Sequence, residues 1–461
     1  MPDFDIAVVG SGPGGYVAAI RAAQLGGKVC VIEKREKDGL GGTCLNRGCI
    51  PSKAIIECAR FFDKVKKAAE FGVSVENPKA DWPKIVARAA GVTDILRRGI
   101  QALLKKNNIE LIVGQGTLRD AREIDVKTAS GTTVVRASKI ILATGSEAAR
   151  PSAFPFDGKQ VIASDEALFL PQLPASALIV GGGYIGCEFA AIFQQLGVQV
   201  TIVEMLDRLI PEMDQDLSAE LFKAFKKRKI AVNLGTKIES LSAVNGKVAA
   251  KLSNGQAIEA GVALICVGRV GNLAGIGLEK VGVKYTPQGI ETNEFMQTNV
   301  PNIYAIGDIT TKWKLAHVAS KEGKVAAAHA MGKHEKMSYR VVPSCVFTSP
   351  EVASVGITEQ QAEAKGLNIK TSKFPFMAIG KARAGGEMEG FVKIIGDAQT
   401  SEVLGVHIIG PEAGDLIAEA AMAIELEAIV DTLAETIHTH PPLAEALMES
   451  AEMWLGSPIH M

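Results

Sequence analysis

This sequence has no long apolar run. Nowhere does it approach the roughly 18 consecutive apolar residues that a membrane-spanning helix requires, and a strand pattern begins a few residues after Met1. We therefore expect neither a membrane span nor a signal peptide. The expected location is the cytoplasm, or an organelle matrix if a transit peptide has been removed.

An excess of charge of one sign is also missing. The 50 Lys and Arg residues nearly balance the 51 Asp and Glu residues, which gives a formal net charge of −1. Without a strong global field, the chain is not expected to bind nucleic acid or an anionic membrane. The expected partners are small molecules and protein surfaces.

Cysteine is scarce as well. The seven cysteines are odd in number and thinly spread through 461 residues, unlike the disulfide framework of a small extracellular protein. Most lie in apolar runs and are expected to be buried, unreactive thiols. Cys44 and Cys49 differ, because glycine, asparagine and arginine surround them. They are the candidate reactive pair.

A strand–turn–helix–strand pattern occurs twice. In the first copy, an apolar strand at residues 4–9 leads into a glycine-rich turn at 10–15, an alanine-rich helix and a second strand that ends at Glu33. In the second copy, the turn at 181–186 is followed by a helix and a strand that ends at Glu204. The turn glycines and the acidic residue recur at one offset of 171 positions. One βαβ design therefore appears twice, in a chain long enough for about three or four domains.

Glycine-rich turns of this kind bind dinucleotides. The first glycine permits the tight bend, the second admits the pyrophosphate, and the third lets helix and strand pack closely. The helix N-terminus attracts the phosphates, while Glu33 and Glu204 are placed to bind ribose hydroxyls. One motif alone could be an ordinary turn, but two in register predict two dinucleotide sites. Glu204 would repel a 2′-phosphate, which favours NAD(H) in the second site, and Arg208 nearby leaves NADP(H) as the alternative.

Cys44 and Cys49 follow the first βαβ unit directly, within reach of the dinucleotide that it is expected to hold. A redox disulfide is the simplest use of such a pair. Because the thiolate is the reactive form and a free cysteine has a pKa of about 8.5, we expect Arg47, Lys53 and a helix start near Pro51 to lower the thiol pKa. A metal site would need further ligands, and a purely structural bridge is the other alternative.

Residues 41–53, which read GGTCLNRGCIPSK, resemble the active-site signature of the class I pyridine nucleotide–disulfide oxidoreductases. The resemblance extends over essentially the whole chain. It implies FAD in the first nucleotide-binding domain, NAD(P) in the second, and Asp308 on the flavin ribitol. It also implies that Cys44 exchanges with the substrate and that Cys49 contacts the flavin.

Residues 438–445, HTHPPLAE, resemble the HxHPTxxE motif of the same family. The resemblance implies that His440 is the acid/base of thiol–disulfide exchange and that Glu445 orients it, and imidazole titrates in the range this chemistry needs. Taken alone, His438 and His440 could be metal ligands or solvated turn residues. In this family the histidine reaches the cysteines of the neighbouring subunit, which implies a homodimer.

The predicted fold class is α/β, with two Rossmann-like dinucleotide-binding domains and a C-terminal α+β dimerisation domain. We expect an FAD-binding domain at 1–147, an NAD-binding domain at 148–269, a central domain completing the FAD site at 270–337, and an interface domain at 338–461. No metal site is expected. The residues expected at FAD are Gly10, Gly12, Gly14, Gly15, Glu33, Gly42, Thr43, Lys53, Thr144, Gly145, Asp308 and Ala316. Those expected at NAD or the flavin edge are Gly181, Gly183, Ile185, Gly186, Glu188, Glu204 and Gly268.

Residues 348–356, 373–376 and 404–411 are similar to the family members that oxidise dihydrolipoamide with NAD+. The expected substrate is therefore dihydrolipoamide, carried in some systems on the lipoyl domain of a 2-oxoacid dehydrogenase or glycine cleavage complex. The alternative is an NAD(P)H-dependent reductase of another disulfide, such as a glutathione or coenzyme A disulfide.

Some positions depart from the usual pattern of these members or carry two interpretations. The departures are Arg47 between the cysteines, Gly271, the segment 310–314 and Pro442. Arg47 could stabilise a thiolate, bind an anionic disulfide or project into solvent. Tyr184 could shield the flavin or be a packed aromatic. Lys53 and Glu188 could pair beside the flavin or be solvated helix charges.

Overall fold

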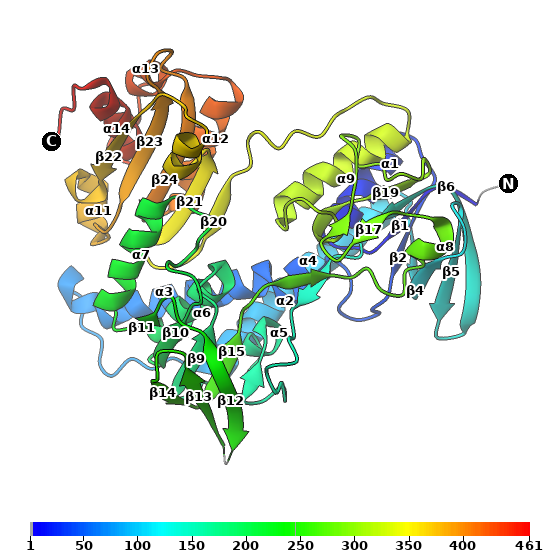
Figure 1. Cartoon of the computed structure of the whole chain (residues 1–461), viewed down its shortest axis with the longest axis horizontal. Coiled ribbons are helices and arrows are strands. Elements are labelled where there is room, and N and C mark those ends of the chain that lie inside the picture. The colour runs from blue at the N-terminus through cyan, green and yellow to red at the C-terminus, as the bar shows by residue number, and fades with distance from the viewer. Residues whose placement is uncertain (1–2, 245) are drawn as a thin grey trace. The chain divides into compact units, whose positions relative to one another are not determined.

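The structure is a computed structural model that describes residues 3–244 and 246–461. Its helices and strands are labelled in Figure 1. Unit 1 comprises the residues up to Glu57, Asp81–Ala149 and Gly268–Ser338. Unit 2 comprises Cys58–Ala80, Arg150–Val267 and Tyr339–Met461. Within the described ranges, no helix is both long and apolar enough to cross a membrane.

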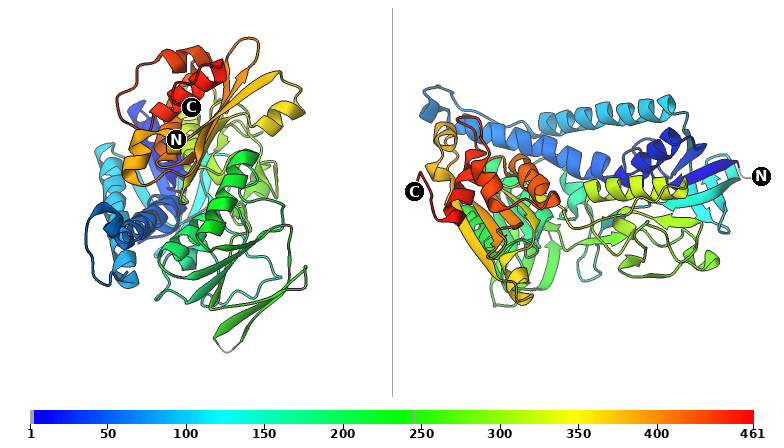
Figure 2. Two further views of the ribbon diagram at one scale, coloured as in Figure 1. Left: turned by 90° about the vertical axis from the view of Figure 1, so that its left-hand side faces the viewer. Right: turned by 90° about the horizontal axis from the view of Figure 1, so that it is seen from above.

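Unit 1 is built on a parallel sheet with the strand order β3-β2-β1-β6-β19. The bounds are β1 (Phe4–Val9), β2 (Val29–Glu33), β3 (Glu110–Val113), β6 (Gly131–Leu142) and β19 (Ile303–Ala305). The strand β1 is apolar at nearly every position because both faces of the sheet are covered. Ile6 and Val8 pack toward α1 (Pro13–Gln24) and α9 (Ala316–Ala330), which lie side by side (Figure 1, Figure 2). Ala7 and Val9 pack on the other face.

Shorter elements complete unit 1. The first half of β6 continues into an antiparallel sheet with β5 (Glu123–Thr128) and β4 (Gln115–Leu118). Further pairs are β7 (Ser146–Ala148) with β16 (Arg269–Gly271), and β17 (Tyr285–Thr286) with β18 (Gly289–Ile290). The helices are α2 (Gly42–Arg47), α3 (Cys49–Lys66), α4 (Trp82–Lys106), α8 (Leu278–Val281) and the 3-10 turn η2 (Gly307–Ile309). The helix α3 begins in unit 1 and ends in unit 2.

Unit 2 holds a second parallel sheet, with the order β11-β10-β9-β15-β8. The strands are β8 (Val161–Ile162), β9 (Ser176–Val180), β10 (Gln199–Val203), β11 (Ala231–Asn233) and β15 (Val262–Ile265). The helices around it are α5 (Ser164–Ala167), α6 (Tyr184–Gln195) and α7 (Gln215–Lys227). An antiparallel sheet consists of β12 (Ile238–Val244), β13 (Lys247–Leu252) and β14 (Ala257–Ala260).

The two parallel sheets share one turn geometry between the first strand and the first helix. Gly10 and Gly181 have φ angles of +102° and +109°, which favour glycine. A Cβ on Gly15 would lie 2.0 Å from the Gly10 carbonyl oxygen, and a Cβ on Gly186 would lie 2.0 Å from that of Gly181. The third glycine of each motif is therefore required for helix and strand to approach. The predicted pair of Rossmann-like folds is confirmed.

The remainder of unit 2 is an antiparallel sheet with the order β20-β21-β24-β23-β22. Its strands are β20 (Ser344–Val346), β21 (Glu351–Gly356), β22 (Ile369–Pro375), β23 (Phe391–Asp397) and β24 (Val403–Gly410). The helices are α10 (Glu359–Ala364), α11 (Gly380–Gly385), α12 (Ala413–Glu425), α13 (Val430–Glu435) and α14 (Glu445–Leu455). Helices α12 and α14 cover one face of the sheet (Figure 2). This arrangement confirms the predicted C-terminal α+β region.

A buried lysine joins the two parts of unit 2. Val392 and Ile394 of β23 point into the core with α12 and α14, so Lys393 between them points to the opposite face. Its side chain is fully buried, with Nζ 2.9 Å from Asp214, 2.7 Å from Asp216 and 2.5 Å from Glu359. Burial by itself would lower the pKa of Lys393, but these carboxylates outweigh it and raise the pKa. Lys393 therefore links the start of α7 to the antiparallel sheet as a cation.

We predict that Lys393→Met destabilises unit 2 strongly. Removing the lysine leaves the fully buried Asp214 without its compensating charge, a loss that typically costs about 3–5 kcal/mol. Lys373→Met is the matched control, because Lys373 binds the same Asp216 at 2.9 Å but is 47% exposed. The control should cost at most about 1 kcal/mol. Thermal unfolding of both variants tests this, and equal shifts in melting temperature would contradict it.

Candidate active site

The glycine-rich turn of unit 1 forms a cradle of backbone. Gly12 precedes the first residue of α1, and Pro13 occupies that first position, so no side chain caps the helix start. Gly42, the first residue of α2, has a φ of +60°, and a Cβ there would lie 2.6 Å from the Gly12 Cα. The segment that leads to the cysteines therefore touches the turn backbone to backbone. The free N–H groups at the start of α1 and the lack of side chains suit a pyrophosphate.

The two predicted ribose-binding carboxylates are held in the same way. Glu33 accepts hydrogen bonds from the Ser11 N–H at 3.1 Å, the Ser11 hydroxyl at 2.6 Å and the Arg35 N–H at 3.1 Å. Glu204 accepts from the N–H groups of Gly182 at 2.5 Å and Leu206 at 2.7 Å, positions that correspond to Ser11 and Arg35. Both carboxylates are 7% exposed. Each retains acceptor sites for ribose hydroxyls, so the residues present fit a dinucleotide in both copies.

Asp308 lies in a network with two residues that were not predicted as site residues. The Ser146 hydroxyl donates to the Asp308 carboxylate, and Arg269 donates from Nε to that hydroxyl at 2.8 Å. Arg269 also donates to the Ser146 carbonyl at 2.8 Å, which Thr43 contacts at 3.4 Å. The network brings Thr43 and Asp308 together. The signal for the missed pair was present: Ser146 ends the small-residue run after β6, and Arg269 is the second residue of GRVGN.

The other predicted cofactor-binding residues of unit 1 lie near element ends. Thr144 and Gly145 follow β6 after Ala143, and the Thr144 hydroxyl donates to the Asn272 carbonyl at 2.9 Å. Ala316 is the first residue of α9, and Gly14 packs against that helix, where a Cβ would lie 2.9 Å from the Ala319 carbonyl oxygen. Gly268 has a φ of +117° and begins the return of the chain into unit 1.

The cysteine pair lies across the junction of two helices. Cys44 is in α2, Cys49 is the first residue of α3, and Gly48 separates the helices. The two thiols lie close together. Cys44 is half-buried and Cys49 is exposed. The fold therefore places the two sulfurs where a redox pair requires them.

The pKa of the Cys44 thiol is raised. The hydrogen bond to the Cys49 thiol is the main cause, followed by burial and by the negative charge that Cys49 can carry. Lys53 and the Cys49 N–H act in the opposite direction, as expected from the sequence, but they are outweighed. The expectation of a lowered pKa is therefore wrong for Cys44. Two thiols this close titrate as a pair.

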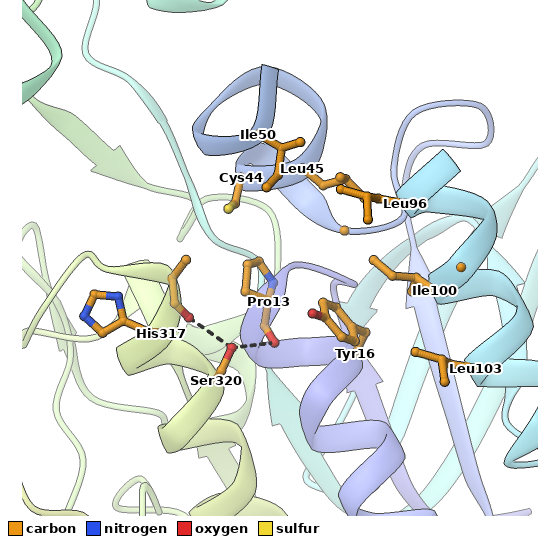
Figure 3. Close-up of a pocket in the computed structure, with 13 residues that line it drawn as sticks. Pro13, Tyr16, Cys44, Leu45, Ile50, Leu96, Ile100, Leu103, His317 and Ser320 are labelled. Carbon is orange, nitrogen blue, oxygen red and sulfur yellow. Dashed lines mark hydrogen bonds between the residues drawn. The ribbon is translucent and has the colours of Figure 1, made fainter. Parts of the chain in front are cut away.

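A cavity of about 420 Å³ opens beside Cys44 within unit 1 (Figure 3). Its walls come from α1, α2, α3, α4 and α9 and are largely apolar. The lining residues are Pro13, Tyr16, Gly41, Cys44, Leu45, Ile50, Leu96, Gly99, Ile100, Leu103, Ala316, His317 and Ser320. The pKa of Tyr16 is raised, by burial and by the proximity of Cys44. An apolar chain that carries a sulfur could reach Cys44 here.

Two histidines of unit 2, His438 and His440, have different surroundings. The His440 Nδ1 lies 2.7 Å from Glu445, the first residue of α14, and the His440 side chain is 81% exposed. The His438 side chain is 7% exposed, with Nε2 2.8 Å from Glu419 and Nδ1 2.8 Å from the Thr436 carbonyl. Both nitrogens of His438 are thus engaged. His440 has its Nδ1 oriented by a carboxylate and is the one suited to proton transfer.

The second glycine turn completes the predicted positions. Gly183 precedes α6, whose first turn contains Ile185 and Gly186, and the buried Glu188 further along α6 accepts from the Phe347 N–H at 3.0 Å. Arg208 is the residue that kept NADP(H) as the alternative nucleotide. Its guanidinium group donates a hydrogen bond to the Pro211 carbonyl at 3.0 Å. The pairing of Lys53 with Glu188 and the shielding role of Tyr184 stay predictions. Among residues 3–244 and 246–461, no group of three or more possible metal ligands is present.

Family models match nearly the whole chain. A model described as pyridine nucleotide-disulphide oxidoreductase matches residues 4–323, and one described as the dimerisation domain of the same family matches residues 342–451.

Named relatives cover the chain from end to end. Dihydrolipoyl dehydrogenase of Chlamydia muridarum is 43% identical over 99% of this chain and 98% of its own length. The protein of that name from Thermus scotoductus is 42% identical over 100% of this chain and 99% of its own length.

Among solved structures, LpdA from Mycobacterium tuberculosis has a TM-score of 0.91 at 30% identity, covering 97% of this chain and 99% of that chain. The HOCl-induced flavoprotein disulfide reductase RclA from Escherichia coli has a TM-score of 0.88 at 26% identity, with the same coverage.

We predict that Gly42→Ala loses bound flavin. Its Cβ would collide with the Gly12 Cα at 2.6 Å and push the two backbones of the cradle apart. Gly72→Ala is the control, because Gly72 has a similar φ of +75° but nothing within 4 Å of the added Cβ. The control should cost only about 1–2 kcal/mol of backbone strain. The ratio of flavin absorbance to protein after gel filtration tests this, and an equal ratio in both variants would contradict it.

Proposed function

This chain belongs to the pyridine nucleotide–disulphide oxidoreductase family, and we propose that it oxidises dihydrolipoamide to lipoamide through a Cys44–Cys49 redox disulfide, with NAD+ as final acceptor. The observation that carries the proposal is the pair of neighbouring cysteines beside both the dinucleotide cradle and an apolar cavity. Relatives named dihydrolipoyl dehydrogenase, 40–43% identical over almost their full length, support the substrate. The cofactors are FAD and NAD.

The proposed domains follow the nucleotide motifs. We assign residues 1–147 to FAD binding, 148–269 to NAD binding, 270–337 to the region that completes the FAD site, and 338–461 to the subunit interface. In support, unit 1 unites residues up to Glu57, Asp81–Ala149 and Gly268–Ser338, and so combines most of the first and third domains. Residues 58–80, however, cluster with unit 2.

The cysteines and His440 carry the proposed thiol–disulfide exchange. A thiolate of dihydrolipoamide attacks the Cys44 sulfur of the oxidised pair, which breaks the bond to Cys49 and forms a mixed disulfide. The second substrate thiolate then displaces Cys44, and lipoamide leaves with both of its sulfurs joined. His440 accepts the substrate proton while Glu445 holds its Nδ1. FAD, when bound, supplies the two-electron carrier between the dithiol and NAD+.

The places of the two cysteines support distinct roles. Cys44 is half-buried and lines the apolar cavity, whereas Cys49 is exposed at the start of α3. Lys53, one turn further along α3, acts against the rise in the pKa of the Cys44 thiol. We therefore assign Cys49 as the sulfur that contacts the flavin and Cys44 as the one that exchanges with substrate.

The chain matches a dimerisation domain over residues 342–451, which supports a homodimer. We propose that the His440–Glu445 pair of each chain serves the cysteine pair of the other. Dihydrolipoamide could be presented free or on the lipoyl domain of a 2-oxoacid dehydrogenase or glycine cleavage complex. The apolar walls of the cavity beside Cys44 suit the aliphatic arm of either form.

A substrate panel tests the proposed activity. We expect NADH formation from dihydrolipoamide and NAD+, less from NADP+, and little reduction of glutathione disulfide or coenzyme A disulfide by NADH. Preference for one of those disulfides would favour the alternative reductase instead. Cys44→Ser and Cys49→Ser should each abolish dihydrolipoamide oxidation, because either change removes the redox disulfide.

Anaerobic reduction separates the two cysteines. A long-wavelength absorbance band from a thiolate against the flavin should persist in Cys44→Ser and disappear in Cys49→Ser. If the band survives Cys49→Ser, the assignment of the two sulfurs is wrong.

We predict that His440→Gln lowers kcat for dihydrolipoamide by about 10²- to 10⁴-fold, because a positioned general base is lost. His460→Gln is the matched control. His460 also pairs through Nδ1 with a carboxylate of α14, Glu449, at 2.5 Å, and it is 67% exposed. The control should keep kcat near that of the unaltered protein. Steady-state kinetics decide, and a similar loss in both variants would contradict the role of His440.

A further inference from the structure

Asn46 lies between the two cysteines and is 5% exposed. Its side-chain nitrogen donates to the carbonyls of Leu40 and Gly42, each at 2.8 Å. Both hydrogens of the amide are therefore used to join the end of α2 to its first residue and to the segment before it. Gly42 is the residue that touches Gly12 in the dinucleotide cradle, so Asn46 connects the redox helix to that cradle.

The carbonyl oxygen of Asn46 is held by an arginine from a distant part of the sequence. Arg97 of α4 donates to Asn46 Oδ1 from Nε at 3.0 Å and from a terminal nitrogen at 2.9 Å. The Arg97 side chain is 25% exposed, and Asp94 one turn earlier lies 3.3 Å from its other terminal nitrogen. Two charge-assisted bonds to one acceptor restrict both position and orientation, which a single donor does not.

The same helix forms a wall of the cavity beside Cys44. Leu96, Ile100 and Leu103 of α4 line it, and Arg97 directly follows the first of these (Figure 3). The link from Arg97 to Asn46 therefore fixes the spacing between this wall and the helix that carries Cys44. Arg97 and Asn46 are assigned no part in the proposed thiol–disulfide exchange itself, in which Cys44 reacts.

We propose that Arg97 is a positioning residue for the redox pair, which acts through Asn46 to hold α2 against both the dinucleotide cradle and the wall of the cavity. The inference rests on the proposed redox role of Cys44 and Cys49 and goes beyond it. Cys49 contacts the flavin only if the α2–α3 junction is held in place, and a displacement of about 1 Å can cost about 10²-fold in rate.

Arg98 provides a matched control on the same helix. It is ion-paired with Asp94 at 3.1 Å, as Arg97 is, but its side chain is 68% exposed. Arg98→Met removes the same charge from the same turn and leaves the two bonds to Asn46 intact. Exposed ion pairs of this kind contribute little, so kcat should stay within about twofold.

The test compares Arg97→Met, Arg97→Lys and Arg98→Met as flavin-loaded proteins. In Arg97→Met we expect a weaker long-wavelength band after anaerobic reduction by dithionite, an altered midpoint potential of the dithiol couple, and a kcat lower by about tenfold or more. KM for NAD+ should not change. Arg97→Lys should restore part of the band, because lysine keeps one charged donor but not the fork.

Each outcome bears on the proposal. A band, potential and kcat in Arg97→Met that match Arg98→Met would overturn it, even if the melting temperature falls. If Arg97→Met does not retain flavin, Arg97→Gln is measured in its place. A wild-type band and potential in Arg97→Gln would also overturn the proposal. Absence of the band in the unaltered protein would instead count against the proposed function, which keeps the two failures distinguishable.

Discussion

In both nucleotide-binding folds, the first helix lies very close to the first strand. A side chain on the third glycine of the turn would collide with the carbonyl oxygen of the first glycine. A Cβ at Gly15 or Gly186 would be 2.0 Å from the oxygen at the start of the turn. This contact brings the free N–H groups of the helix start directly over the carboxyl edge of the sheet. The positions of Glu33 and Glu204, which end or follow the second strands, depend on it. In unit 1, the placement of the cysteines depends on it as well, since Gly42 rests on Gly12.

The pKa of the Cys44 thiol depends on how closely the two cysteines lie. The α2–α3 junction brings two sulfurs together, and the proximity of Cys49, together with burial, raises the pKa of the Cys44 thiol. Lys53, one turn into α3, adds a positive charge near them. A lone thiol in the same environment would simply have a raised pKa and little reactivity, as Cys30 does, where burial raises the pKa to about 12. The second sulfur beside Cys44 is what allows this half-buried thiol to take part in redox chemistry.

The sequence predicted best the strand–turn–helix–strand units that occur in it twice. The bounds of β1 and the end of β2 at Glu33 match the predicted strands, because local apolar patterns determine them. The roles of Cys44, Cys49, His440 and Glu445 came from motifs and remain proposals that the contacts support. The pKa of Cys44 was misjudged, because the Cys49 hydrogen bond is stronger than the charges that the sequence displays. Arg97 and Lys393 gave no signal, since their partners are 51 and up to 179 positions away.

The duplicated carboxylates restrict how the second nucleotide site can change. Glu204, which we propose to bind the ribose, also stabilises the loop, because it accepts hydrogen bonds from the N–H groups of Gly182 and Leu206. An apolar or basic residue at this position would leave the buried Gly182 N–H without this acceptor, at a cost of about 1–3 kcal/mol. Acceptance of a 2′-phosphate would therefore need a rebuilt segment after β10. Nucleotide preference in this chain therefore depends on the whole loop. A single substitution at Glu204 would produce a variant in which this loop is destabilised.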